Sequence, residues 1–535
     1  MMRTCFNMDP LTVDPRKNGD LISSAFLFML YEGLTRLLPN GQVELALAKS
    51  VEISKDQCIY TFQLREAKWS DGHPITAFDF EYSWKKSLDP DFSSSCPQLF
   101  YPIKNAEAAS EGKISPEEIR IQALGDRTLQ IELNNPTPYF LSLISFCNFF
   151  PIPRHIEQKN PAWDVQGHAQ NHAKMVPQLI CSGPFKLVKW DWKKEIVLEK
   201  NPLYWDVEQT QLDALHVSII NNEYTTLEMF ENEELDWISF MLTAIPSSVL
   251  GKYIDDGRLK VVPMGGTLFC SFNLHRFPFN NENIRKAFSY AIDRQEIVRQ
   301  TSQLNEIPAK RLIPPVMESS ELSSPLGFDE KLARHYLQKG LLEFGILKNE
   351  SESFNMSDLN IRLFLSNLTL SYDNSQAHRN VAHALQEQWG RVLGFRIKLV
   401  QQDYKTQMEK ITQGDFNIAL KICLAHYNDP LNILERFKYK YLSRNFPKFE
   451  SPEYIDLLDR SSKAYNPEAR QRLLAQAEEH LLDKMPLAPI YHLNYPILSN
   501  ASVQGVELSP IGGLQFRKAT FRSTKLRKKQ IAVSQ

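Results

Sequence analysis

The sequence has little net charge and no closely spaced cysteines. Its 61 lysines and arginines offset 63 aspartates and glutamates, which leaves a formal charge of −2. Because no global field draws such a chain onto a polyanion, no nucleic-acid partner is expected. The seven cysteines include no CxxC pair. This spacing excludes a zinc knuckle and a dense disulfide framework, and it favours buried free thiols.

The sequence also lacks a long apolar run. Its longest apolar stretch, residues 139–153, contains serine, asparagine and cysteine, and it is shorter than the roughly 18 residues that a spanning helix needs. The opening residues MMRTCFNMDP show neither the basic and apolar segments nor the cleavage site of a secretory leader. Since Arg3–Asn7 resembles a first strand, we expect that a leader or lipid anchor lies outside this sequence.

Common catalytic motifs are missing as well. GxxxxGK[ST], GxGxxG, HExxH and GxSxG do not occur, so phosphate loops, dinucleotide turns, zincin helices and hydrolase elbows lack their signatures. His168 and His172 have helical spacing for two metal ligands, but no acidic or thiol third ligand lies close in the sequence. We therefore expect no catalytic residue, no metal and no cofactor. An enzyme with a nucleophile and base that meet only in space stays an alternative.

The amino-acid composition is typical of a folded protein with several structural units. Apolar residues make up 43% and charged residues 23% of 535 residues, which predicts about two to four units of mixed helix and sheet. Helical periodicity predicts helices over Ile284–Ser302, Ala377–Leu393 and Pro467–Lys484. Runs rich in β-branched and aromatic residues predict strands at 58–64, 128–133, 185–189, 195–199, 215–220, 268–273, 361–366, 396–401 and 416–422.

The order of these elements predicts two lobes of different construction. Before about residue 265 the predicted strands come in hairpin-like pairs, whereas later strands alternate with helices in βαβ fashion. Within the first part, Asp71-Gly72 predicts a turn, and Thr76 with Asp79 predicts a capping box that opens a helix.

Six collinear blocks cover most of the chain and resemble a known family. One block reads YTFQLREAKWSDGHPITAFDFEYSWKKSLDP. The blocks span residues 13–37, 60–90, 182–206, 284–300, 416–430 and 454–491. Together they are similar to the peptide-binding subunits of ABC importers, the extracytoplasmic solute-binding proteins of family 5.

The resemblance implies an α/β, two-lobed, periplasmic-binding-protein-like clamshell with mixed sheets, flanking helices and a small inserted domain. The expected boundaries are 1–45, 176–265 and 490–535 for lobe I, 46–175 for the inserted domain and 266–489 for lobe II. The implied function is capture of oligopeptides in an interlobe cleft, with closure about hinges near Pro263–Asn273 and Pro486–Ile490. The implied partner is an ABC permease in the inner membrane. The resemblance further implies a periplasmic monomer without enzymatic activity or cofactor.

The ligand-facing segment departs from the family pattern. In the block matching 416–430, oligopeptide binders of the family carry a pattern like F-D-V-A-R-A-x-W-x-A-D-Y-N-x-P, whose Asp binds the α-ammonium group of the peptide. His426 stands at that Asp, Leu420 at the Arg and Cys423 at the Trp. The ligand-binding residues carried over by the resemblance are Asp20, Leu21, Leu420, Lys421, Cys423, Leu424, His426 and Tyr427.

The missing carboxylate leaves three interpretations open. Another acid, such as Asp20, Asp403 or Asp429, could hold the amine. The ligand could instead be a modified, cell-wall-derived or anionic peptide, or ligand binding could be lost in a surface protein that binds other partners. If His426 titrates near its ordinary pKa of about 6.5, binding of an ammonium group should weaken as the pH falls through that value.

Overall fold

The computed structural model describes residues 1–164, 179–239, 242–243, 245, 249–301, 304–317, 326–348, 367–464 and 466–522. The chain divides into two compact units, Met1–Val262 with Tyr495–Gln535 and Pro263–Asn494. Two strands, β12 (Leu259–Phe272) and β17 (Leu487–Ser499), continue from one unit into the other. The predicted strand 361–366 and the histidines His168 and His172 lie outside the described residues. None of the helices that are described has the length and apolarity to span a membrane.

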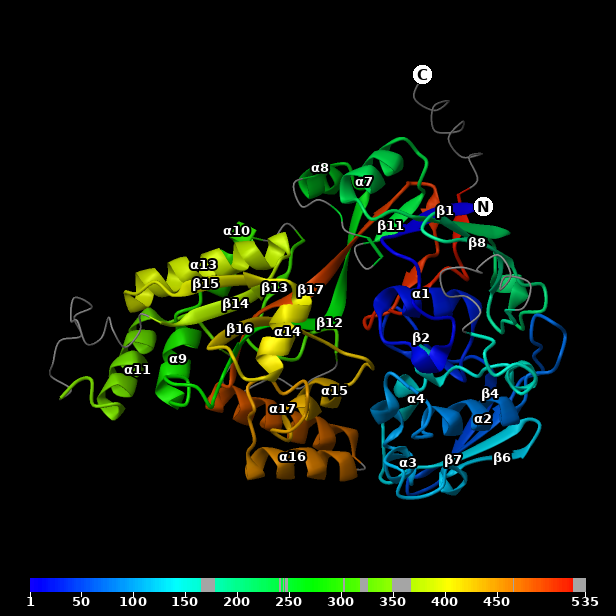
Figure 1. Cartoon of the computed structure of the whole chain (residues 1–535), viewed down its shortest axis with the longest axis horizontal. Helices are drawn as coiled ribbons and strands as arrows, with labels where there is room; N and C mark the ends of the chain where they lie inside the picture. Colours follow the sequence, from blue (N-terminus) through cyan, green and yellow to red (C-terminus); the bar gives the residue numbers. More distant parts are fainter. Residues whose placement is uncertain are drawn as a thin grey trace. The chain divides into compact units, whose positions relative to one another are not determined.

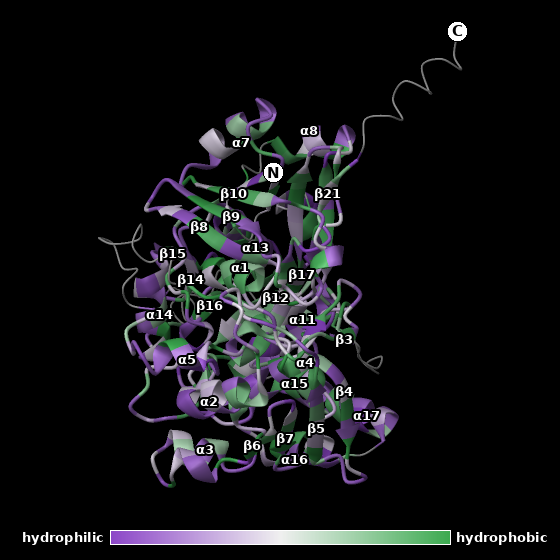
Figure 2. Cartoon of the chain, turned by 90° about the vertical axis from the view of Figure 1, so that its right-hand side faces the viewer, coloured by the Kyte–Doolittle hydropathy of each residue, from purple (hydrophilic) through white to green (hydrophobic). Residues whose placement is uncertain are grey.

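The first unit contains a four-stranded sheet in the order β1-β10-β9-β8. Its strands are β1 (Met2–Phe6), β8 (Phe185–Asp191), β9 (Glu195–Lys200) and β10 (Ala214–Ile219). The three later strands pair antiparallel, as predicted, and β1 joins β10 in parallel. Helix α1 (Leu21–Leu30) packs on β8. Its sequence LISSAFLFML is apolar on most sides, and Figure 2 shows it largely in the hydrophobic colour.

A second antiparallel sheet of this unit has the order β4-β5-β7-β6. It comprises β4 (Ala48–Ile53), β5 (Ile59–Leu64), β6 (Ile121–Gly125) and β7 (Thr128–Glu132). Helix α2 (Ala77–Ser87) covers β6 and β7 (Figure 1). The predicted capping box is confirmed, because the Thr76 backbone N–H donates to the Asp79 carboxylate at 2.8 Å.

Loss of this cap should cost stability. We expect Asp79→Ala to lower the free energy of unfolding by about 0.5–2 kcal/mol, since it removes the carboxylate that accepts from the backbone N–H of Thr76 at the N-cap of α2. Equilibrium urea unfolding measures the change. Glu107→Ala is the control, because Glu107 is an exposed acid in the first turn of α3 (Ala106–Ser110). Equal losses for the two variants would show that the capping hydrogen bond adds nothing.

The second unit is built on a sheet in the order β17-β12-β16-β14-β15. Strands β14 (Thr369–Asp373), β15 (Lys398–Gln402) and β16 (Ile418–Leu424) are mutually parallel. Helix α13 (Gln376–Leu393) connects β14 to β15, and α14 (Tyr404–Thr412) connects β15 to β16. The predicted order is confirmed for α13, β15 and β16, whereas β14 and α14 were not predicted and the predicted strand 361–366 lies outside the described residues.

The helix predicted over Ile284–Ser302 is wrong in its length. The structure has two helices there, α9 (Glu282–Tyr290) and α10 (Arg294–Thr301). Asp293 starts a new first turn by accepting from the backbone N–H of Glu296 at 3.0 Å. The Arg294 guanidinium donates to the Ser289 and Ile292 carbonyls near the end of α9. The apolar spacing continues across this break, and for that reason periodicity alone does not reveal it.

The two other predicted helices are confirmed, α13 within one residue and α17 (Pro467–Lys484) at both ends. Helix α17 packs against α16 (Pro452–Lys463) (Figure 1). Among the residues that the structure describes, the further α-helices are α4 (Phe140–Leu143), α5 (Arg154–Glu157), α7 (Glu223–Glu231), α8 (Leu250–Asp255), α11 (Glu330–Glu343) and α15 (Leu431–Leu434). The remaining strands are β2 (Thr35–Leu37), β3 (Val43–Leu45), β11 (Trp237–Ser239), β13 (Ile307–Pro308), β18 (Val503–Gln504), β19 (Glu507–Leu508), β20 (Leu514–Gln515) and β21 (Thr520–Phe521). All seven cysteines are free thiols, as predicted.

Candidate functional site

Most of the residues predicted to bind ligand lie on β16 and the loop that follows it. Strand β16 runs between β12 and β14 in the sheet of the second unit. Its antiparallel pairing with β12 ends at Leu424 opposite Gly266, and Ala425 adds one further backbone hydrogen bond to Gly265 at 2.8 Å. The chain then turns through residues 425–430 into α15. Ligands of open α/β sheets bind beyond such carboxyl ends of parallel strands, which makes this loop a candidate binding segment.

Leu420 and Lys421 point to opposite faces of β16, because side chains alternate along a strand. Leu420 is fully buried opposite Cys270. Lys421 is also buried, and its ammonium group donates to Gln407 Oε1 at 3.1 Å. Its Nζ lies 5.0 Å from the centre of the Tyr404 ring. Burial lowers the pKa of Lys421 to about 8. This lysine is therefore held against α14 by the Gln407 amide, the Tyr404 ring and the Met408 sulfur, which lies 3.1 Å from Nζ.

Cys423 and Leu424 are linked by one guanidinium group. Arg436 Nη1 donates to Cys423 Sγ at 3.2 Å, and Arg436 Nη2 donates to the Leu424 carbonyl oxygen. Cys423 is buried, and burial raises the pKa of its thiol. Arg436 follows α15 on the 3₁₀ turn Glu435–Phe437. Nothing in the sequence pattern had singled out Arg436.

His426 occupies the position of the family carboxylate but is held as a neutral side chain. Its backbone N–H donates to Asn432 Oδ1 at 2.8 Å, and Arg436 Nη2 donates to the same oxygen at 3.2 Å. Burial, reinforced by the positive charges of Arg436 and Arg444, lowers the pKa of His426 to about 3. The expectation that His426 titrates near pH 6.5 is therefore wrong, because the group is desolvated among cations.

A neutral His426 has a measurable consequence. We expect wild type and His426→Asn to show the same change of peptide affinity between pH 8 and pH 5, because His426 takes up no proton in this range. Calorimetric titration of one peptide at pH 8, 6.5 and 5 measures the two profiles. A loss of affinity on acidification that is present in wild type and absent in His426→Asn would contradict the low pKa.

Tyr427 and Asp429 serve internal contacts of the loop. The buried Tyr427 hydroxyl donates to Glu435 Oε1 at 3.1 Å, and burial raises the pKa of Glu435 to about 7. Both carboxylate oxygens of buried Asp429 accept from the Arg470 guanidinium, at 2.7 and 2.9 Å. Asp429 is thus engaged by a cation of its own unit, which argues against it as the acid that holds a ligand amine.

The two other acids that could bind the α-ammonium group of a ligand, Asp403 and Asp20, both cap helices. Asp403 is exposed and accepts from the backbone N–H of Thr406 at the start of α14. Asp20, in the first unit, accepts from the Ser23 backbone N–H at 2.8 Å, and exposed Leu21 begins α1 behind it. Each carboxylate retains acceptor capacity beyond its cap.

Positive charges predominate around His426, whereas Lys421 lies near the Asp373 carboxylate and Arg436 near Glu435. Lys421, Arg436 and Arg444 all act on this segment, and Arg444 is exposed. The hydrogen bonds of the Arg436 guanidinium go to neutral groups, namely Cys423 Sγ, Asn432 Oδ1 and the carbonyl oxygens of Leu424 and Asn432. Such an environment opposes a ligand ammonium group and favours a carboxylate.

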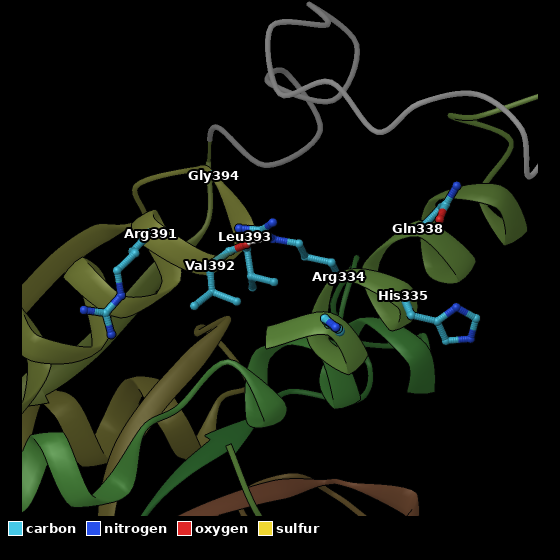
Figure 3. Close-up of a pocket in the computed structure, with 8 residues that line it drawn as sticks. Arg334, His335, Gln338, Arg391, Val392, Leu393 and Gly394 are labelled. Atoms are coloured by element: carbon cyan, nitrogen blue, oxygen red, sulfur yellow. Dashed lines mark hydrogen bonds between the residues drawn. The ribbon is translucent and has the colours of Figure 1, made fainter. Parts of the chain in front are cut away.

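A separate pocket of about 510 Å³ in the second unit contains none of the predicted residues. Figure 3 shows Arg334, His335 and Gln338 of α11 along one side and Arg391 to Gly394, at the end of α13, along the other. Arg334 pairs with Glu330 and Arg391 with Glu296, each at 2.6 Å. Because acids of the same unit balance these cations, the pocket is a weaker candidate for an anion site than the β16 segment.

Comparison with known proteins relates the whole chain to one family. The profile of bacterial extracellular solute-binding proteins, family 5, matches residues 42–445. The oligopeptide-binding protein OppA of Bacillus subtilis is 36% identical over 518 residues, which cover 96% of this chain and 91% of that protein.

Solved structures show the same relationship. The murein tripeptide binding protein MppA of Escherichia coli superposes with a TM-score of 0.79 and 26% identity over 98% of each chain. Haemophilus influenzae OppA in complex with RPPGFSPFR gives 0.77 and 25%, over 98% of this chain and 99% of that one. The predicted two-lobed α/β class is confirmed by these neighbours. The chain therefore belongs to family 5 of the bacterial extracellular solute-binding proteins.

Proposed function

We propose that the protein is an extracytoplasmic solute-binding subunit that captures oligopeptides and delivers them to an ABC permease in the inner membrane. The observation that carries this proposal is the 36% identity to an oligopeptide-binding protein over 96% of the chain. The sequence supplies no catalytic motif, and the protein acts by binding without making or breaking a bond. The proposal includes a periplasmic monomer and the expected division into two lobes and an inserted domain.

Peptide capture fits the chemistry of a strand end. An extended peptide offers backbone N–H and C=O groups that pair with strand edges regardless of sequence, while pockets accept its side chains. In the β16 loop the nearest backbone groups are already engaged, because the Leu424 carbonyl accepts from Arg436 and the His426 N–H donates to Asn432. A peptide would therefore meet this loop through its side chains. The charges of Lys421, Arg436 and Arg444 determine which ligand charge this segment prefers.

A second ligand class is favoured by the positive charges of Lys421, Arg436 and Arg444. A modified or cell-wall-derived peptide that presents a carboxylate, or that lacks a free α-ammonium, suits this segment better than an ordinary peptide. Mass spectrometry of ligands that co-purify with the protein from native cells distinguishes the two classes. Absence of any peptide-like ligand, together with no calorimetric signal from peptides, would overturn both.

Ligand binding should also compact the protein. We expect the radius of gyration to fall on saturation with a bound ligand, because the family resemblance implies closure of two lobes. Small-angle scattering with and without a ligand measures it, and calorimetry on the same sample establishes occupancy. An unchanged radius at full occupancy would contradict closure.

A further inference from the structure

Three potential metal ligands of the first unit meet outside the candidate peptide site. Asp71 and His73 lie on the loop between β5 and α2, and His155 lies on α5. Their ligand atoms, one carboxylate oxygen and two imidazole nitrogens, all lie within 4.8 Å of one another. Asp71 and His155 are 84 positions apart. This separation explains why spacing in the sequence gave no sign of the cluster.

Both imidazoles are directed at the same carboxylate oxygen. Asp71 Oδ2 lies 2.7 Å from His155 Nε2 and 3.0 Å from His73 Nδ1. The two rings are stacked, with their centroids 4.2 Å apart and an interplanar angle of 26°. The other oxygen, Asp71 Oδ1, accepts from the backbone N–H of His73 at 3.1 Å. The two ring nitrogens thus converge on Asp71 Oδ2, and all three ligand atoms lie within 4.8 Å of one another.

The loop that carries Asp71 and His73 is fixed by its backbone. Trp69 N–H donates to the His73 carbonyl at 2.8 Å, and Gly72 N–H donates to the Trp69 carbonyl at 2.9 Å. Gly72 has a φ of +92°, a conformation that side chains disfavour. The Trp69 side chain is fully buried and anchors this turn in the core.

The helix that carries His155 is also anchored. Glu157, two residues further on α5, pairs with the fully buried Arg16 guanidinium at 2.8 Å. Neither ligand-bearing segment has to fold when an ion binds, so little ordering entropy opposes binding. The histidine side chains remain reachable, with exposed fractions of 57% for His73 and 23% for His155.

The donor set suits a first-row transition ion of the Zn²⁺ class. Imidazole nitrogen and carboxylate oxygen bind Zn²⁺ at about 2.0–2.2 Å, so donor atoms of a tetrahedral site lie about 3.3 Å apart. To hold an ion, the two O···N separations of 2.7 and 3.0 Å must open by a few tenths of an ångström, and the Asp71 carboxylate and the two rings must turn until all three atoms face the ion. If His155 Nε2 and His73 Nδ1 bind the ion through their lone pairs, the N–H proton of each neutral imidazole lies on the other nitrogen, His155 Nδ1 and His73 Nε2. Ca²⁺ and Mg²⁺ prefer all-oxygen sites and fit this set poorly.

We propose that Asp71, His73 and His155 form a surface binding site for one divalent transition-metal ion, with water completing its coordination. The site is independent of the peptide-binding proposal, because all three ligands lie on the first unit and none belongs to the predicted ligand set. Exposure on one side leaves it accessible to solution ions, as expected for a site that loads reversibly.

Titration of the purified full chain with ZnCl₂ in a non-chelating buffer, followed by calorimetry, tests the proposal. We expect one equivalent to bind with a micromolar dissociation constant. His73→Ala and His155→Ala should each weaken it by at least about 100-fold, since loss of even an outer-shell partner costs about 10–100-fold. His383→Ala, an exposed histidine on α13, and the double variant His168→Ala/His172→Ala are controls that should bind as wild type does.

X-ray absorption at the zinc edge gives an independent readout. We expect two nitrogen-type imidazole ligands with oxygen ligands in wild type, and one imidazole ligand or none in His155→Ala. Binding weaker than millimolar in wild type would overturn the proposal. Unchanged zinc affinity in both ligand variants would overturn it too. The melting temperatures of the variants and of wild type are also compared with and without Zn²⁺. If the variants melt lower by the same amount in both conditions, the cluster only stabilises the packing of α5 against the loop and binds no ion.

Discussion

Asp429→Asn is expected to lower the free energy of unfolding by about 3–5 kcal/mol, because it removes the carboxylate from a buried guanidinium. Arg470 Nη1 and Nη2 lie 2.7 and 2.9 Å from the two oxygens of Asp429, and both side chains are almost fully buried. Asparagine preserves the size and the oxygen that accepts from Leu431 N–H. The loss therefore reports the unpaired charge rather than a cavity.

The matched control is Asp456→Asn, which breaks the exposed pair of Asp456 with Arg460 on α16. Such surface pairs contribute about 0–1 kcal/mol. Equilibrium urea unfolding of the three proteins at pH 7 measures both effects. If Asp429→Asn lowers the free energy of unfolding no more than Asp456→Asn does, the ion pair of Asp429 with Arg470 contributes little. Asp429 would then again be a possible partner of the ligand amine.

His426→Asp is expected to raise the affinity for peptides with a free α-ammonium by about 10- to 150-fold. A carboxylate at this position restores the charge-assisted hydrogen bond that the family pattern provides, and such bonds contribute about 1.5–3 kcal/mol net. Arg436 and Arg444 lie close enough to depress the pKa of His426. The same cations keep an introduced aspartate ionised, and they also compete with the ligand for it.

His426→Asn separates charge from size in this experiment. It has the shape of aspartate without the charge, so its affinity should stay within a few-fold of wild type. Calorimetric titration with a tripeptide and a tetrapeptide measures all three proteins. If His426→Asn gained as much as His426→Asp, the relief of steric crowding rather than a restored carboxylate would account for the change.

The sequence predicts those parts of the fold that depend on local pattern. The apolar stripe of Pro467–Lys484, bounded by Asn466 and Pro486, predicts α17 at both ends, and alternation predicts β5, β7, β9 and β16 within two residues. Continuation of α9 into α10 is predicted wrongly, because the break depends on polar contacts of Asp293 and Arg294 that leave the apolar spacing intact.

The candidate site is less predictable, because its electrostatics come from residues distant in the sequence. The family pattern locates Lys421 and His426, but it does not reveal that burial, together with Arg436 and Arg444, keeps His426 neutral, or that Arg470 occupies Asp429. The assumption of an ordinary histidine pKa failed for this reason. The cluster of Asp71, His73 and His155 escapes sequence analysis for the same reason, since α5 and the turn meet only in the folded chain.

Titration of wild type with one tripeptide in its free and N-acetylated forms tests whether this site recognises the amine of a peptide. We expect wild type to bind the free form no more tightly than the acetylated form, because no carboxylate stands at residue 426 and Arg436 and Arg444 oppose the ammonium group. Sub-micromolar binding of the free peptide, at least tenfold tighter than that of the acetylated one and with no gain in His426→Asp, would contradict this expectation. That result would mean that another carboxylate holds the peptide amine.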